Sequence, residues 1–402
     1  MATSAASYVS DIPRVDTAPR VPWTVWAGAL AVTCSTIGGT WDVSWHRSIG
    51  RDSFLTPAHV LIYACGAIAA LICGYLILYT TFGNSQQLKN ESVAVLGFRA
   101  PLGAFIAAWG GIAMLTSAPF DNWWHNAYGL DVKIVSPPHT LLILGIRGVS
   151  VGVTFLILAA MNRLAAAGQI HALSADAEST YKTLQTLFLY VGGITVIGQM
   201  FFIQEYTWDV VLHSTGAYIA VGIAVPMAFA AISRASGNRW ACTICASVYT
   251  LFVVAEIQIL PLVHATPKLG PVYYPVTHLV PGKFPVLIIV PAIVLDLLWQ
   301  RLRNWKVWEL ALLSGVVFVA VIITVEWPFA NFLMSKAADN RFFGSIYFDY
   351  TARANSYERL REFFEPASGI RLATGLAWAS ACAFFSTWFG LWFGNWMRGV
   401  QR

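Results

Sequence analysis

Long apolar runs separated by short polar connectors fill most of the chain from Val21 onward. About 20 apolar residues span a bilayer, and ten segments reach or approach that length. None alternates residue by residue as a barrel strand does, and lipid satisfies no backbone hydrogen bond, so each segment is predicted to be an α-helix. The predicted spans are 22–40, 57–82, 101–119, 137–161, 184–204, 214–233, 241–263, 284–299, 307–330 and 371–393.

The composition is typical of an integral membrane protein, so the lipid bilayer is its first expected partner. Of 402 residues, 57% are hydrophobic and only 11% are charged, which a water-soluble domain of this size would not tolerate. The net charge is +5, but the Lys and Arg residues do not cluster in a basic run, so nucleic acid is not an expected partner. Residues 1–21 are polar and show no cleavage signal, so we predict a retained first span after a cytoplasmic N-terminal segment.

Lysines and arginines concentrate in alternate connectors, and short loops rich in these residues face the cytoplasm. This bias predicts five helical hairpins that open outward, with both termini cytoplasmic. We expect metal-binding hairpins over 22–165 and further spans over 166–402, with a long outer loop at 331–370 that forms an interfacial cover or a substrate gate. The predicted cytoplasmic cations are Arg14, Arg20, Lys89, Arg99, Arg163, Lys182, Arg234, Arg239, Arg301, Arg303, Lys306, Arg398 and Arg402.

Seven of the eight histidines fall at the outward mouths of these hairpins, and the first mouth holds a recognisable set. Asp42 and His46 are four residues apart, which places both side chains on one face of a helix. His59 follows two residues after Pro57, with Thr56 in position to cap the next helix. Together the three side chains are a candidate metal site.

The second mouth repeats this arrangement with Asp121, His125 and His139, the last opening a helix after Ser136 and two prolines. The Asp-x3-His spacing occurs three times, against about 0.2 times expected at random for this composition. The alternative is that these are polar helix ends that cap, pair and snorkel. A carboxylate and two imidazoles near lipid are costly unless a cation compensates them, which favours metal binding at both mouths.

The later hairpins carry less complete sets. Glu205, Asp209 and His213 would share one face if the segment were helical, and they are candidate additional ligands. His264 and His278 lie fourteen residues apart without an acid, which fits a structural or substrate-contacting role as well as a ligand role.

Two imidazoles and one carboxylate suit copper, zinc or iron(II) better than magnesium or calcium, which prefer oxygen ligands throughout. The ligand set does not choose among these three metals. Three protein ligands leave a coordination position for water, dioxygen or substrate, as a reactive metal site requires.

The segments 39–59 (GTWDVSWHRSIGRDSFLTPAH) and 121–139 (DNWWHNAYGLDVKIVSPPH) resemble the metal-binding segments of the C subunit of particulate methane and ammonia monooxygenases. The resemblance covers about residues 37–161. It implies one copper site at each triad, in an inner-membrane enzyme complex with partner subunits that hydroxylates a small apolar or uncharged substrate with dioxygen. Asp121 departs from the family, where an Asn is common at this position.

Two charged residues lie deep in predicted spans. Arg147 sits ten residues into the fourth span and Glu256 eight residues before His264. An Arg at that depth needs compensation, so we predict that the two side chains pair, with separate pairing or snorkelling as the alternative.

Three functions fit these observations. The first is a copper-dependent oxidoreductase subunit of the monooxygenase type. The second is a membrane protein that captures, stores or transports copper without turnover, although it lacks the Met and Cys ligands that suit Cu(I). The third is a scaffold with a structural ion. Assembly with partner subunits or with further copies of the chain is compatible with all three.

Overall fold

Ten helices of 13 residues or more account for most of the described chain, which in this computed structural model comprises residues 20–50, 53–129, 136–170, 174–268, 276–347 and 365–402. Eight of them are long and apolar enough to cross a bilayer, so the chain is a multi-pass, all-α membrane protein. The helices are α1 (Trp23–Ser48), α2 (Pro57–Phe82), α4 (Leu102–Tyr128), α5 (Pro137–Ile170), α6 (Ala175–Phe202), α7 (Thr215–Ser236), α8 (Ala241–Ile259), α9 (Ile289–Arg301), α10 (Val307–Leu333) and α12 (Gly369–Met397).

A helix lies at each of the ten predicted places, and the two outside the set of eight differ for physical reasons. Helix α1 carries many Thr, Ser and Gly residues and is therefore less apolar. Helix α9 has 13 residues, which at 1.5 Å per residue is about 20 Å and short of a hydrocarbon core of about 30 Å. It begins at Ile289 rather than at 284. Pro285 disfavours helical geometry at Phe284, and the backbone N–H groups of Val286 and Leu287 donate to the side chains of Tyr249 and Glu326.

Short elements complete the described structure. Strands β1 (Val93–Val95) and β2 (Phe98–Ala100) pair antiparallel, joined by Leu96 and Gly97, which both have positive φ as a type I′ turn requires. The others are the five-residue helix α3 and five single turns of 3₁₀-helix: α3 (Gln86–Asn90), η1 (Gln204–Tyr206), η2 (Asp209–Val211), η3 (Leu260–Leu262), η4 (Lys336–Ala338) and η5 (Ser345–Tyr347).

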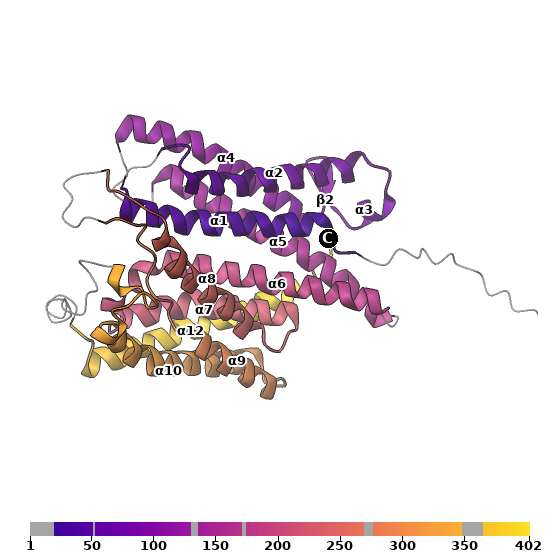
Figure 1. Cartoon of the computed structure of the whole chain (residues 1–402). Coiled ribbons are helices and arrows are strands. Elements are labelled where there is room, and N and C mark those ends of the chain that lie inside the picture. The colour runs from indigo at the N-terminus through magenta and orange to yellow at the C-terminus, as the bar shows by residue number, and fades with distance from the viewer. Residues whose placement is uncertain (1–19, 51–52, 130–135, 171–173, 269–275, 348–364) are drawn as a thin grey trace, which may run out of the picture.

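The helices form two packed groups. Helices α1, α2, α4 and α5 make one group, and α6, α7, α8, α9, α10 and α12 make the other, with α5 and α1 packing against α6 between them (Figure 1). The start of α1 and the C-terminus lie at the same end of the molecule, beside α3 (Figure 1). The end of α1, the start of α2, the end of α4 and the start of α5 lie at the opposite end, so both predicted mouths share one end of the fold (Figure 1). Of the predicted outer loop, residues 348–364 lie outside the described residues.

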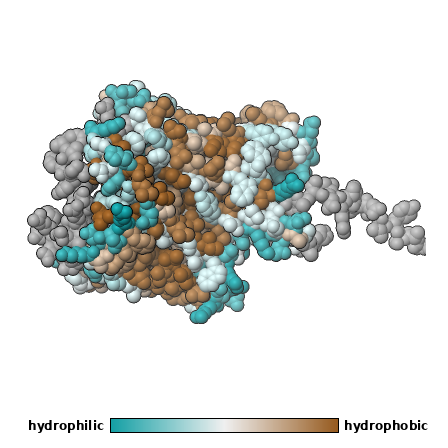
Figure 2. All heavy atoms as spheres, in the orientation of Figure 1, coloured by the Kyte–Doolittle hydropathy of each residue, from teal (hydrophilic) through white to brown (hydrophobic). Residues whose placement is uncertain are grey.

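Apolar side chains cover the middle of the molecule, while hydrophilic residues gather toward both ends (Figure 2). Several helices also expose large apolar side chains, such as Leu71 of α2, Trp109 of α4 and Leu251 of α8. Such a belt is what a protein surrounded by lipid must present, because lipid offers no partner for polar groups.

Glycines bring α4 and α5 into close backbone contact. A Cβ at Gly110 would lie 2.5 Å from the Val149 N and 2.7 Å from the Gly145 O, so only glycine fits. Small residues at such crossings let membrane helices approach closely. Because α4 carries Asp121 and α5 carries His139, this crossing also sets the distance between the two side chains.

We expect Gly110→Ala to lower the free energy of unfolding by about 1–3 kcal/mol, since the added methyl group overpacks a backbone contact. Gly74→Ala in α2 is the matched control, because its Cβ would meet nothing within 4 Å and alanine favours the helix by about 1 kcal/mol. Thermal unfolding in detergent measures both. Equal midpoints for the two variants would contradict the proposed tightness of the α4–α5 crossing.

Candidate metal centres

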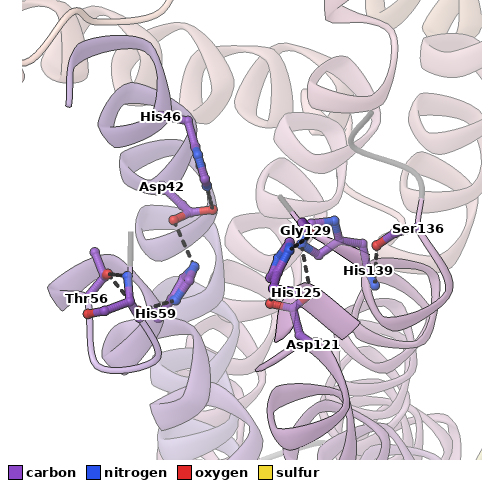
Figure 3. Close-up of polar contacts among 10 residues, drawn as sticks. Asp42, His46, Thr56, His59, Asp121, His125, Gly129, Ser136 and His139 are labelled. Atoms are coloured by element: carbon purple, nitrogen blue, oxygen red, sulfur yellow. Dashed lines mark hydrogen bonds and ion pairs between the residues drawn. The ribbon is translucent and has the colours of Figure 1, made fainter. Parts of the chain in front are cut away.

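The first triad is built by the end of α1 and the start of α2. Helix α1 continues two turns beyond the predicted boundary to Ser48, which places Asp42 and His46 on its last two turns. His59 is the third residue of α2. Its Nε2 lies 3.2 Å from Asp42 Oδ1, and His46 Nε2 lies 3.7 Å from Asp42 Oδ2. The two imidazoles thus converge on one carboxylate, as predicted (Figure 3).

The second triad repeats this geometry on α4 and α5. Helix α4 continues through Pro119 to Tyr128, so Asp121 and His125 occupy successive turns near its end. His125 Nε2 lies 3.4 Å from Asp121 Oδ2, and His139 Nε2 lies 3.4 Å from Asp121 Oδ1. In each triad, one ligand atom from every residue lies within 4.8 Å of the other two. Figure 3 shows the two triads side by side at neighbouring hairpin mouths.

Local hydrogen bonds orient these side chains. The Nδ1 atoms of His59 and His125 lie 3.1 Å from the backbone carbonyls of Ser53 and Gly129 (Figure 3). A carbonyl only accepts, so each Nδ1 donates its proton and leaves Nε2 directed at the carboxylate. This is the usual arrangement of a metal-binding imidazole, whose other nitrogen is held by an outer partner.

The predicted helix caps are formed in different ways. The Ser136 hydroxyl accepts from the His139 backbone N–H at 3.4 Å, which confirms a side-chain cap at α5. Thr56 occupies the N-cap of α2, but its hydroxyl donates back to Ser53 O at 2.7 Å rather than accepting from the helix. Thr56 therefore fixes the turn that supplies the carbonyl partner of His59.

The donor set of each triad suits a cation. With Nδ1 held by a carbonyl, Nε2 is the ring nitrogen that faces the carboxylate, and it becomes a metal ligand once it is deprotonated. Asp42 Oδ1 is buried, and His59 Nε2 lies 3.2 Å from it. Two ligands about 2.1 Å from a tetrahedral ion lie about 3.4 Å apart, close to the separations found. The residues therefore fit a transition-metal ion in each triad.

Both triads border one cavity of about 420 Å³. Five of the six ligand residues line it, and the remaining wall is mostly apolar. Its principal apolar residues are Ile62, Tyr63, Leu142, Ile143, Ile146, Phe201 and Trp208. A chamber of this kind accommodates a small apolar molecule beside both candidate ions.

A second, smaller cavity of about 100 Å³ adjoins the first and is more polar. Arg47 and Trp208 line both cavities. The Arg47 guanidinium and the Lys283 ammonium lie 5.7 and 5.5 Å from the centre of the Trp208 ring. Glu256 also lines this polar chamber, within hydrogen-bonding reach of the Thr40 side chain. Sequence reasoning missed Lys283 and Trp208, because no spacing rule connects them to the triads.

The third predicted ligand set does not converge. The segment after α6 breaks into η1 and η2, so Glu205, Asp209 and His213 do not share a helical face. Asp209 Oδ2 lies 3.9 Å from Lys283 Nζ, and His213 Nε2 lies 3.2 Å from the Trp327 carbonyl. Glu205 lines the apolar cavity. The prediction that these three residues form one site is therefore wrong.

The fourth predicted set is brought together by backbone rather than by ligand atoms. His264 and His278 face each other across an isolated antiparallel bridge. The His278 ring packs 4.9 Å from the Tyr347 ring. Within the described residues, neither histidine belongs to a group of three ligands, so a structural role fits both better than metal binding.

The predicted pair of Arg147 and Glu256 is not formed among the described residues. The Arg147 guanidinium lies over the Phe202 ring at 4.8 Å, whereas Glu256 faces Thr40. Similar depth in the membrane did not imply that the two helix faces point toward each other.

The pH dependence of stability tests the burial of Lys283 in the polar chamber. Burial lowers the pKa of Lys283 from 10.5 to about 8, partly offset by Asp209 and reinforced by Arg47. Between these values the unfolded chain binds more protons than the folded chain, so stability rises with pH, by at most about 1.4 kcal/mol per pH unit. We expect Lys283→Met to remove this rise in thermal unfolding from pH 8 to 10. Lys182→Met, at a largely exposed lysine, should keep it, and an unchanged slope in Lys283→Met would contradict the shift.

Comparison of the chain with protein-family models, with curated proteins and with solved structures gives no match. The resemblance to the monooxygenase subunit therefore stands on the sequence segments 39–59 and 121–139 alone. What the described geometry adds is independent of that resemblance. Two carboxylate-centred triads lie at one end of a membrane bundle, beside a shared apolar cavity.

Proposed function

We propose that each triad binds one copper ion and that the chain is the metal-binding subunit of a membrane monooxygenase that hydroxylates a small apolar or uncharged substrate with dioxygen. The observation that carries this proposal is the shared cavity. Ligand residues of both triads border a single chamber whose other walls are mostly apolar. A purely structural ion would not need such a chamber.

Different residues bind the metal ions and position the substrate. Asp42, His46 and His59 hold one ion, and Asp121, His125 and His139 hold the other. Copper, when bound, supplies the binding and reduction of dioxygen, and three protein ligands leave a coordination position for it. The apolar wall binds the substrate and excludes water from the reacting atoms. Glu256 in the adjoining polar chamber is a carboxyl group placed to pass protons toward the cavity.

The membrane arrangement follows from the same proposal. Both ends of the described chain lie at the end opposite the triads (Figure 1), and the predicted cytoplasmic loops are rich in Lys and Arg. We therefore place both termini in the cytoplasm and the triads at the outer face of a plasma membrane. Electrons and any further catalytic groups come from partner subunits.

Copper capture without turnover is the second candidate. It is favoured by His46, whose side chain is 47% exposed and is therefore open to an ion arriving from outside. In that case the shared cavity would be a passage between the two triads. Bound copper without oxygen consumption in the complete complex would select this function.

Metal analysis of the purified full-length chain tests the binding step. We expect two copper ions per chain in the wild type, one in His59→Ala, one in His125→Ala and none in the double variant. Loss of a ligand should lower affinity by more than the roughly 10–100-fold that loss of an outer partner costs. His278→Ala is the control and should keep both ions, because His278 lies outside the triads. A wild type without metal, or single variants that keep two ions, would overturn the proposal.

A cavity-filling variant tests the substrate site. Ile143→Trp should narrow the apolar cavity and reduce oxygen-dependent turnover of larger hydrocarbons by at least about tenfold relative to smaller ones, with metal content unchanged. Ile112→Trp is the matched control, since Ile112 is 50% exposed on the outer side of α4. An equal effect of both substitutions on all substrates would exclude this cavity as the substrate site.

A further inference from the structure

Arg147 is a charged side chain in the middle of a membrane-spanning helix. It follows Pro137, the first residue of α5, by ten positions, which corresponds to about 15 Å along the axis. The hydrocarbon core is about 30 Å thick, so the guanidinium belongs near mid-depth if α5 begins at the membrane surface. Such a position is unfavourable unless a partner neutralises the charge.

The described part of the chain provides a fitted place for this side chain but no counter-charge. The guanidinium packs over the Phe202 ring at 4.8 Å, and a Cβ at Gly198 would come within 2.6 Å of its nitrogens. Across the described ranges, no carboxylate or carbonyl oxygen pairs with it. A ring face compensates a cation only in part, so several N–H donors still require an acceptor.

Arg147 is half-buried where α5 packs against α6, beside residues that are exposed at the surface of the bundle. Leu144 and Val151, three residues before and four after it, share its helical face, and their exposed fractions are 63% and 43%. Phe202 beside it is 47% exposed. These residues form a surface that we call the Arg147 face, consisting of Leu144, Arg147, Val151 and Phe202.

The mid-span acids described in the chain are already engaged elsewhere. Glu256 lines the polar chamber. Asp296 accepts from the Thr243 backbone and hydroxyl, and Glu326 accepts from the Leu287 N–H. Asp296 and Glu326 are at most 2% exposed. A second copy of the described chain therefore offers no lipid-facing carboxylate to the Arg147 face.

We infer that the Arg147 face docks a transmembrane helix of a different polypeptide, one that carries an Asp or Glu near its midpoint. A carboxylate there would satisfy the guanidinium at the depth where it lies, and Leu144, Val151 and Phe202 would pack against the apolar flanks of the same helix. A lipid phosphate is less suited, because headgroups lie at the membrane surface while Arg147 lies about half a core thickness inside. This inference is independent of metal binding.

The test is site-specific photocross-linking of the full-length chain in its native membranes, with benzoylphenylalanine at position 151. We expect a cross-link to one polypeptide whose cross-linked peptide, identified by mass spectrometry, is a transmembrane segment containing Asp or Glu. Arg147→Gln should lower the yield by at least about tenfold, whereas Arg147→Lys should largely keep it because it retains the charge. Changing the partner's carboxylate to its amide should repeat the effect of Arg147→Gln.

The same photoreactive residue at Leu251, which is 70% exposed on α8, is the control and should not respond to Arg147→Gln. If Arg147→Gln fails to fold, the amide variant of the partner, with Arg147 intact, decides the question. Cross-links only to lipid, only to a second copy of the chain, or to a helix without an acid would overturn the inference. So would a yield that is insensitive to both amide substitutions.

Discussion

The convergence of two imidazoles on one carboxylate is the arrangement around which the candidate centres are built. Backbone carbonyls accept the Nδ1 protons of His59 and His125, which leaves Nε2 of each ring facing a carboxylate oxygen. Beside apolar walls a carboxylate is screened less than in water, so an opposite charge close to it is strongly stabilising. An imidazolium proton or a metal ion supplies that charge at the same position.

The helices make this convergence possible by continuing past their apolar segments. Asp42 and Asp121 lie on turns that follow the apolar parts of α1 and α4, while His59 and His139 open the next helices. The i,i+4 spacing aligns an acid with one imidazole, and the hairpin brings the second imidazole from the neighbouring helix. The glycine-lined crossing of α4 and α5 then holds the spacing fixed. The packing of the membrane helices therefore also determines the geometry of the ligands.

The sequence predicted what depends on local spacing. Apolar length located the helices, and Asp-x3-His located both triads. Prediction failed where the outcome depends on how helices rotate or where they end. Asp209 and His213 keep the spacing of the triads, yet the chain after α6 forms 3₁₀ turns and directs them to Lys283 and Trp327. Arg147 and Glu256 have similar depths but face different neighbours, because depth along an axis says nothing about rotation around it.

The cavities give the triads a chemical context that ligands alone do not. The larger cavity beside the two triads has a mostly apolar wall, while the adjoining chamber is lined by Arg47, Glu256 and Lys283. Trp208 lines both cavities and lies near two cations. Its ring therefore adjoins the mostly apolar wall of one cavity and the charged groups of the other. In the proposed oxidation, the apolar wall would bind the substrate and the charged groups would exchange protons.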